Sequence, residues 1–526
     1  MAAMNFSGTV RISNIDDYIA PSQECIKPLV DRMSSSKQKQ SGGPGAAKTS
    51  PASLVSVEKR TPRVEYAQVV PKLDSTSLTD NLELRRNELP PTEAVKITLN
   101  DCLACSGCVT TAESILIEQQ SYKALRDVLR ANTKTVIASV SPQSLASISV
   151  SLGCSMEKTL QRVVHFLTEQ GVQLVLPIAF ARVFSLLAAQ TEFVARYKRA
   201  KTDGHANLLP TMASSCPGWI CFVEKTHGDQ LIPLLSRTRS PQAVAGALVK
   251  SYLARKNAWR ACDVYHASVM PCFDKKLEAS RTQMTQTHDD QLIPETDCVI
   301  SSAELLEWMN DAKADEYSEA DSERLLQKIW PPVKNWRHAL TSHEGGGSGG
   351  YAHHVLRYAA KQLFGIDNCT YVTNRITKDF DELLLFPPTD SQSAHSTPSP
   401  TDQSASPLLR FARAYGFRNI QNLVLKLKRG KLARYDYVEV MACPAGCVNG
   451  GGQVRPRLPT ERTEVLARVR DCYERELEAE SPEDNEMARE IATELFENDW
   501  SGEDCERYLY TDYAALEMSV AAQIRW

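Results

Sequence analysis

The sequence lacks a long apolar run: no uninterrupted stretch reaches the roughly 20 residues that a membrane-spanning helix needs. It also begins without a basic segment followed by an apolar one, so no secretory signal is expected. The formal net charge is only -4 and the pI is near 6.3, a balance that gives no electrostatic reason to expect nucleic acid or an anionic membrane as partner. We therefore expect a soluble, unsecreted protein of the cytoplasm, or also of the nucleus, that binds neither nucleic acid nor membrane.

The cysteines are the most informative residues of the chain. There are 15 of them, an odd number, and several stand three or four positions apart. Such grouping in a large chain without a signal peptide argues against a disulfide framework. It favours thiolates that bind metal in a reducing compartment.

Apolar runs alternate with amphipathic helical patterns along much of the chain. The segments between the runs, such as 155–170 and 241–257, repeat apolar residues at the i, i+3, i+4 spacing of helices. This alternation predicts an α/β fold with a mostly parallel sheet. Strands are expected over 134–142, 172–179, 207–215, 264–271, 297–302 and 435–442.

Two segments lack the apolar residues needed to form a core. Residues 33–53, continuing through polar sequence towards 90, and residues 387–407 are rich in Ser, Pro, Gly and Gln. We interpret both as surface insertions without regular structure.

Three cysteines form a compact motif, "DCLACSGC", in which Cys102, Cys105 and Cys108 have C-x2-C-x2-C spacing. This spacing favours one corner of an iron–sulfur cubane, because the short loops turn successive sulfurs onto adjacent irons. The fourth ligand must come from elsewhere: bacterial ferredoxins place it where this chain has Ala112, and Cys25 is the only upstream candidate. Zinc bound by four cysteines is the alternative, although such sites usually show two separated C-x2-C pairs.

Four further cysteines each follow an expected strand. They are Cys216 in "SSCPGW", Cys272 in "MPCFDKK", and Cys443 with Cys447 in "MACPAGCVNGGGQ". Because the carboxyl ends of parallel strands meet at one edge of a sheet, these loops should converge on a single crevice. Taken singly, each cysteine is more often a small buried apolar residue. Together the four suit a second cubane.

The residues next to these cysteines support this interpretation. Pro217 suits the first position of a helix, which places Cys216 at the N-terminus, where the helix dipole favours a thiolate. Lys275 would offset the negative charge of a four-thiolate cluster, and glycines 450–452 leave backbone amides free to approach sulfur. The segment "EGGGSGGY" at 344–351 either brings amides to a ligand in the same way or forms a flexible hinge.

The loops "SSCPGW", "MPCFDKKLEASR" and "EVMACPAGCVNGGGQ" resemble, in this order, the signature loops of the iron-only hydrogenases. With "DCLACSGC", "PSQECIKP" at 21–28, "AYGFRNIQNLV" at 414–424 and the terminal Trp526, they resemble the eukaryotic hydrogenase-like branch of that family. The resemblance covers nearly the whole chain apart from the two low-complexity insertions.

The resemblance implies an iron-only-hydrogenase-like, two-lobed α/β fold with parallel sheets, preceded by a small N-terminal iron–sulfur region. The N-terminal region would span 1–125, with its insertion near 33–90. The two-lobed domain would span 126–490, with its insertion near 387–407, and a helical tail would span 491–526.

The resemblance also implies two 4Fe–4S clusters. We expect the first to be the labile one, because the low-complexity insertion interrupts its ligands. The first set of ligands would be Cys25, Cys102, Cys105 and Cys108, and the second set Cys216, Cys272, Cys443 and Cys447.

One residue departs from the hydrogenase pattern. Hydrogenases have a second cysteine before the first ligand of the buried cluster, and it delivers protons to a diiron subsite; this chain has Ser215. A hydroxyl has a far higher pKa than a thiol and relays protons poorly near neutral pH. Lys275, Glu278 and Met441 do match the hydrogenase loops. We therefore expect a retained crevice without hydrogenase activity and assign no catalytic residue.

The function implied is that of a cluster carrier or adaptor in cytosolic iron–sulfur protein assembly. Such a protein would relay clusters from an upstream scaffold complex to a targeting complex, which includes a WD40-repeat subunit and loads cytosolic and nuclear apoproteins. The chain ends in "AAQIRW", where Trp526 offers a partner an aromatic anchor beside a carboxylate. Trp526 is therefore the expected docking residue, although physics alone would leave it as an ordinary terminal side chain.

Three other functions stay open at this point. A hydrogenase-type redox enzyme would show infrared bands from carbonyl and cyanide ligands. A nuclear interaction protein, as in a sister branch of the family, would bind a prenylated lamin tail whatever its cluster content. A structural zinc protein would be identified by metal analysis.

Overall fold

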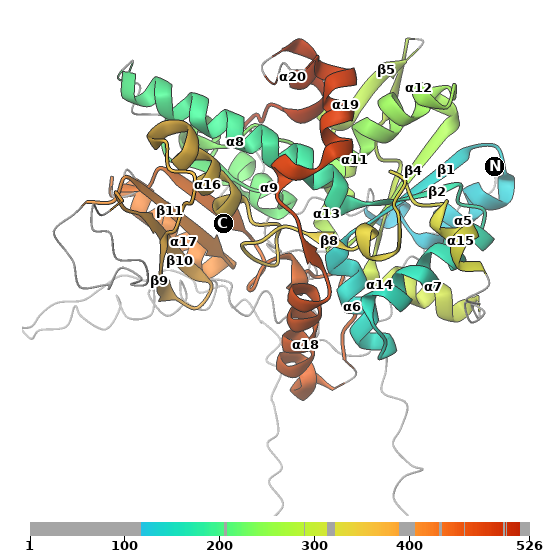
Figure 1. Ribbon diagram of the computed structural model, residues 1–526. Helices are drawn as coiled ribbons and strands as arrows, with labels where there is room; N and C mark the ends of the chain where they lie inside the picture. The colour runs from blue at the N-terminus through green and yellow to red at the C-terminus, as the bar shows by residue number, and fades with distance from the viewer. Residues whose placement is uncertain are drawn as a thin grey trace, which may run out of the picture. The chain divides into compact units, whose positions relative to one another are not determined.

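The computed structural model describes residues 117–202, 204, 208–288, 290–312, 321–388, 406–430, 434–456, 458–497, 500 and 502–515 (Figure 1). These residues belong to one compact unit, made of Met1–Val10, Asn14–Cys25 and Ile97–Trp526. The second unit, Arg11–Ser13 and Ile26–Lys96, lies outside the described residues, as does the predicted insertion near 33–90. Of the predicted insertion 387–407, only the end residues 387–388 and 406–407 are described.

The first sheet has four parallel strands in the order β2-β1-β4-β7. Each strand coincides with an apolar run that predicted it. The strands are β1 (Thr135–Val140), β2 (Leu174–Pro177), β4 (Val264–Met270) and β7 (Cys298–Ser301).

The helices follow the strands as the alternating pattern predicted. The expected helix 155–170 is α7, and the expected helix 241–257 is a continuous segment of α11, a π-helical turn over Leu248–Leu253 and α12. The principal helices are α5 (Tyr122–Ala131), α6 (Pro142–Leu152), α7 (Met156–Glu169), α8 (Ile178–Thr202), α9 (Pro217–Thr226), α11 (Pro241–Ala247), α12 (Ala254–Lys256), α13 (Asp274–Ala279), α14 (Ser302–Asp311), α16 (Tyr351–Phe364), α17 (Phe417–Lys428), α18 (Arg462–Arg475), α19 (Glu486–Phe496) and α20 (Glu503–Leu509).

Strand β1 is buried on both faces. Val136 and Ala138 join a core with side chains from α6 and α7, whereas Ile137 joins a different core with side chains from α8 and α11. Helices therefore cover both faces of the sheet. Its strands are mostly apolar along their length because neither face is exposed to solvent.

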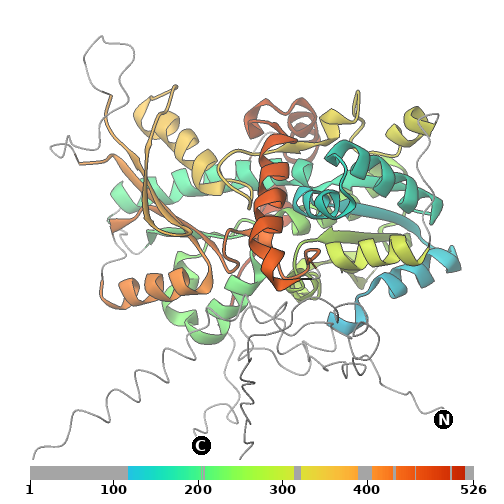
Figure 2. The ribbon, with the colours of Figure 1, turned by 90° about the horizontal axis from the view of Figure 1, so that it is seen from below.

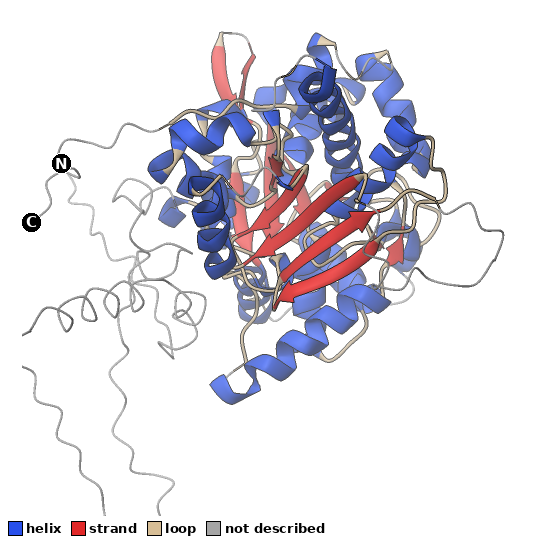
Figure 3. Ribbon diagram, turned by 90° about the vertical axis from the view of Figure 1, so that its left-hand side faces the viewer, coloured by secondary structure: helices blue, strands red, loops and turns tan. Residues whose placement is uncertain are grey.

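The second sheet has five strands in the order β3-β12-β11-β10-β9 (Figure 3). β3, β12 and β11 are parallel, and β10 pairs antiparallel with both β11 and β9. The strands are β3 (Thr211–Ala213), β9 (Val372–Thr377), β10 (Phe380–Leu385), β11 (Leu409–Tyr415) and β12 (Tyr437–Met441).

Helix α8 connects the two sheets. Its first half, including Phe184, packs in the core of the first sheet, and its second half, including Phe193, packs against β11 and β12 of the second. By length and composition alone α8 could cross a membrane, but 78% of its apolar window is buried within the fold. Figure 1 shows it running from one sheet to the other.

The C-terminal helices pack on the same two cores. α18 contacts α6 and stands between the elements of the two sheets in Figure 2. Ile491 of α19 and Leu509 of α20 are buried in the core beside α8. The architecture is thus α/β with parallel strands in both sheets, as predicted, and the second sheet adds two antiparallel strands, β10 and β9.

Candidate metal centre

Four cysteines from three loops line one cavity. Cys216 lies between β3 and α9, Cys272 between β4 and α13, and Cys443 and Cys447 follow β12. The structure therefore brings together the four residues that the sequence predicted as the second ligand set.

The strands that carry these loops differ in one respect from the expectation. β3 and β12 belong to the second sheet, whereas β4 belongs to the first. The cavity therefore lies where the carboxyl ends of strands from two sheets meet, and not at one edge of a single sheet. Sequence periodicity identifies a strand but not the sheet it joins, which is why this division was not predicted.

Cys216 has the predicted helix-terminal position. It precedes Pro217, the first residue of α9, and its Sγ accepts a hydrogen bond from the backbone N–H of Ala442 at 3.5 Å. The backbone N–H of Trp219 also lowers the pKa of this thiol. Backbone donors of this kind stabilise a thiolate.

Burial raises the pKa of all four thiols, that of Cys216 to about 12. As thiolates, Cys216, Cys443 and Cys447 raise the pKa of neighbouring cavity thiols. The buried carboxyl of Asp274 raises the pKa of Cys216, Cys272 and Cys443 further. Without a bound cation the four groups would be neutral thiols near pH 7. Metal binding requires thiolates, so a cation in the cavity would have to displace these protons.

The donor set fits an iron–sulfur cluster. The described cysteines are free thiols, and four of them, carried by three loops, line the same cavity. Within the described residues, no three His, Cys, Asp or Glu side chains lie close enough to hold a single metal ion. Thiolates spread around a cavity are the arrangement by which proteins hold a four-iron cluster.

Lys275 lines the cavity as expected, but its charge is shared. Its Nζ donates to both carboxylate oxygens of Glu278, at 3.0 and 2.9 Å, and to Ser240 Oγ at 2.9 Å. It still opposes the effect of burial on the pKa of Cys447. Lys275 therefore contributes positive potential at the cavity without being a free cation.

Arg182 is a cavity residue that the sequence reading missed. It lies on α8, is 3% exposed, and its positive charge also opposes the effect of burial on the pKa of Cys447. The available signal was a single arginine inside the apolar run "VLPIAFARVFSLLAA". A charge at such a position needs a compensating partner when buried.

The glycines after Cys447 act differently from the expectation. The amides of Gly450 and Gly452 donate to the carbonyl oxygens of Cys447 and Pro271, so they are not aimed at sulfur. A Cβ on Gly450 would lie 2.2 Å from Pro271 O. These glycines instead allow the Cys447 loop to pack directly against the loop of Cys272.

The glycine-rich segment 344–351 packs beneath the cavity. Gly349 and Gly350 have positive φ angles, and Gly350 begins α16 as its N-cap. Ser348 lines the cavity and its Oγ accepts a hydrogen bond from the backbone N–H of Cys447 at 3.0 Å. Residues 347–350 are buried, and through Ser348 the segment supports the Cys447 loop.

Ser215, which stands where hydrogenases have a second cysteine, also lines the cavity. Its Oγ lies 3.8 Å from Met441 Sδ. The first ligand set, Cys25, Cys102, Cys105 and Cys108, and the docking residue Trp526 lie outside the described residues.

Residues 134–451 match the family described as iron-only hydrogenase large subunit, C-terminal domain. Among full-length relatives, the chain is 40% identical over 534 residues to the cytosolic Fe-S cluster assembly factor narfl of Xenopus tropicalis. It is 40% identical over 543 residues to cytosolic iron-sulfur assembly component 3 of Rattus norvegicus. Each alignment covers 100% of both chains.

Solved structures give the same relationship. The fold resembles the apo FeFe-hydrogenase HydA1 from Chlamydomonas reinhardtii with a TM-score of 0.60 and 26% identity, covering 75% of this chain and 99% of that one. It resembles the hydrogenase HydA(deltaEFG), a structure titled for stepwise H-cluster assembly, with a TM-score of 0.59 and 25% identity.

Proposed function

Because the chain belongs to the iron-only hydrogenase-like family, in the branch of the cytosolic iron–sulfur assembly factors, we propose that it is a cluster carrier or adaptor and not an enzyme. It works in the cytoplasm, and also in the nucleus, in the assembly of iron–sulfur proteins. It passes 4Fe–4S clusters from an upstream scaffold complex to a targeting complex that includes a WD40-repeat subunit. The names of its full-length relatives support the assembly role.

The observation that carries the proposal is the cavity lined by four buried thiols. Cys216, Cys272, Cys443 and Cys447 would hold the second cluster, each bound through its Sγ. When bound, such a cluster supplies a one-electron redox centre and links three loops covalently. Ala442 and Ser348, by their hydrogen bonds to Cys216 and to the Cys447 backbone, hold two of the ligands in place.

The first cluster is proposed from the C-x2-C-x2-C spacing and from the family resemblance, which adds Cys25. Cys25, Cys102, Cys105 and Cys108 are its ligands, and it is the cluster that is delivered as cargo. A cluster whose ligands are interrupted by a low-complexity insertion should be lost more readily than one held between two sheets. Faster bleaching by oxygen of the N-terminal cluster supports this order, and faster bleaching of the buried cluster contradicts it.

The absence of hydrogen turnover is proposed from Ser215. Its hydroxyl stands at the cavity wall beside Met441, where a proton relay would need a group that ionises near neutral pH. The residues of the crevice are thus used to hold a cluster and not to move protons to a substrate.

The first experiment is to measure iron, acid-labile sulfide and zinc per chain in protein purified without oxygen. About eight irons with matching sulfide support two cubanes. Stoichiometric zinc with little iron overturns the proposal and indicates a structural zinc protein. Carbonyl and cyanide bands in the infrared spectrum would instead indicate a hydrogenase-type enzyme.

The second experiment tests docking. The reconstituted targeting complex is expected to bind the full chain, and Trp526→Ala is expected to weaken that binding, whereas Gln523→Ala serves as control. Equal binding by both variants would remove the docking role of Trp526. Binding of a farnesylated lamin peptide regardless of cluster content would favour the lamin-binding alternative.

A further inference from the structure

The described part of the chain buries five lysines and arginines, and four of these form an ion pair with a carboxylate. The pairs are Arg239–Glu295, Lys250–Asp297, Lys275–Glu278 and Lys276–Glu304, each with a shortest N–O distance of 2.8 or 2.9 Å. Arg182 is the fifth, and no carboxylate of the described residues lies within ion-pair distance of it. An unpaired buried charge is costly, so this exception calls for an anion that the described residues do not supply at ion-pair distance.

The polar contacts of Arg182 are all to neutral groups. Nη1 donates to the hydroxyl of Tyr473 at 3.4 Å, and Nη2 donates to Gln143 Oε1 at 3.3 Å. Nε is buried and has no hydrogen-bond partner. These long, neutral contacts orient the guanidinium but do not balance its charge.

The backbone around Arg182 makes room for it. A Cβ on Gly349, whose φ is +105°, would lie 2.7 Å from both Cδ and Nε of Arg182. The glycine-rich segment that supports the Cys447 loop therefore also admits the guanidinium. A glycine with a positive φ angle at position 349 is therefore what allows the guanidinium to lie at this site.

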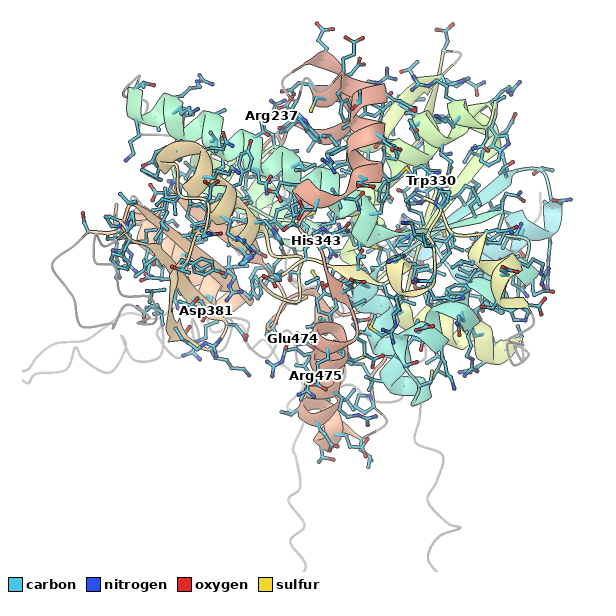
Figure 4. The ribbon with its side chains drawn as sticks, viewed as in Figure 1. Arg237, Trp330, His343, Asp381, Glu474 and Arg475 are labelled. Atoms are coloured by element: carbon cyan, nitrogen blue, oxygen red, sulfur yellow. The ribbon has the colours of Figure 1, made fainter. Side chains whose placement is uncertain are left out.

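The nearby imidazoles remain neutral. Burial lowers the pKa of His343 well below its usual value, and the charges of Arg182 and His354 lower it further. His343 lies in the interior of the structure (Figure 4). Two cations, Arg182 and Lys275, thus line the same cavity as the four thiols, and Lys275 is paired with Glu278. The charge of Arg182 also opposes the effect of burial on the pKa of Glu439, but this carboxylate is not within ion-pair distance of it.

We propose that Arg182 is the buried countercharge of the second cluster. This inference rests on the proposed function, because it requires a cluster on Cys216, Cys272, Cys443 and Cys447. A cubane with four thiolates is an anion, and it gains one more negative charge when a one-electron donor reduces it. In the low-dielectric interior a nearby guanidinium stabilises the reduced form more than the oxidised form, so it raises the reduction potential.

The test is a redox titration with dithionite, followed by electron paramagnetic resonance, on the full-length protein purified without oxygen. The signal of the second cluster is identified as the one that Cys443→Ala removes. Arg182→Gln is expected to load iron and to shift the potential of this signal downwards. It is also expected to release iron to a chelator faster than wild type.

Arg196→Gln is the matched control. Arg196 lies on the same helix and is similarly enclosed, with 12% side-chain exposure, but it pairs with Glu192 and does not line the cavity. The reduction potential of the second cluster in Arg196→Gln should equal that in wild type. Loaded Arg182→Gln protein with the wild-type potential overturns the proposal, because a purely structural residue would change stability and not potential.

Two outcomes separate the possible failures. If wild type shows no signal for the second cluster and binds only about four irons per chain, the proposed second cluster is wrong. The proposed role of Arg182 is then wrong as well. If wild type is loaded but Arg182→Gln does not give soluble protein, Arg182→Lys decides, because its charge lies farther from the cavity. A lowered potential in Arg182→Lys supports the proposal, and an unchanged potential overturns it.

Discussion

Arg239 holds Glu295 by donating from Nη1 to both of its carboxylate oxygens, at 3.0 and 2.8 Å, with both side chains buried. Burial raises the pKa of Glu295, and the charge of Arg239 opposes that rise. The same guanidinium donates from Nε to the carbonyl oxygen of Tyr510 at 2.9 Å. One buried arginine therefore fixes the segment after α20 to the core.

Replacing this arginine should strongly destabilise the fold. Arg239→Met leaves the Glu295 carboxylate buried and unpaired, and we expect a loss of about 3–5 kcal/mol in the free energy of unfolding. Arg237→Met is the control, since Arg237 is 43% exposed and pairs with Glu506 and Asp512 at the surface (Figure 4). Its loss should be at most about 1 kcal/mol. Equal losses in urea denaturation would show that the ion pair is not decisive.

Replacing a single cavity cysteine should remove about half of the iron bound per chain. Cys443→Ala is expected to keep about four irons per chain and to lower the thermal midpoint, because the binding energy of a buried cluster is also folding energy. Cys505→Ala is the control: Cys505 is fully buried in another core and should leave the iron content unchanged. Wild-type iron content and midpoint in Cys443→Ala would contradict a buried cluster.

Stability should fall on acidification because of His266. This residue is fully buried, with Nε2 at 2.9 Å from Ser139 Oγ, and burial lowers its pKa from 6.5 to about 3. The unfolded chain takes up a proton below pH 6.5 that the folded chain does not, so the stabilisation present above that pH is lost as pH falls towards 3. Between pH 7 and 5 the expected loss is about 2 kcal/mol.

The measurement is the free energy of unfolding as a function of pH. His266→Asn should have a flatter profile than wild type, whatever its absolute stability. A wild-type slope in His266→Asn would show that other groups cause the acid sensitivity.

Direct contact between two cysteine loops should make Gly450 irreplaceable. Its φ is -58°, which any residue adopts, so the cost of Gly450→Ala comes from the Cβ that would meet Pro271 O at 2.2 Å. We expect a loss of more than about 2 kcal/mol in the free energy of unfolding, together with loss of iron. Gly153→Ala has φ +65° and no neighbour within 4 Å, so its cost should be about 1 kcal/mol. Equal losses in the free energy of unfolding for the two variants, measured by urea denaturation, would show that the close contact of Gly450 with Pro271 is not decisive.

The buried parallel strands were predictable because no face of them meets water. Val136 and Ile137 face different cores, so the whole segment of β1 is apolar and stands out in the sequence. Cys216 and Cys272 were predictable for the related reason that each directly follows such a strand. The place of these two cysteines in the fold thus followed from the local sequence pattern.

Strands β10 and β11 were not predicted because they carry charged residues whose ion-pair partners lie far away in the sequence. Asp381 on β10 meets Arg413 on β11 at 2.9 Å, and Glu382 meets Arg410 at 3.5 Å. In the sequence these residues break the apolar pattern. The role of Arg182 could not be predicted because it is a single charge in an apolar run and has no partner nearby in the sequence. Only the folded structure shows that it lines the cavity.

The strand order of the second sheet also affects how the protein is made. β3 pairs with β12, and Cys216 contacts Ala442, which lies 226 residues later in the chain. Because a ribosome adds residues from the N-terminus, the buried site does not exist until both partners of this pairing have been synthesised. Cys25, Cys102, Cys105 and Cys108 are all complete much earlier. The proposed first cysteine set is therefore synthesised in full before the second set can come together.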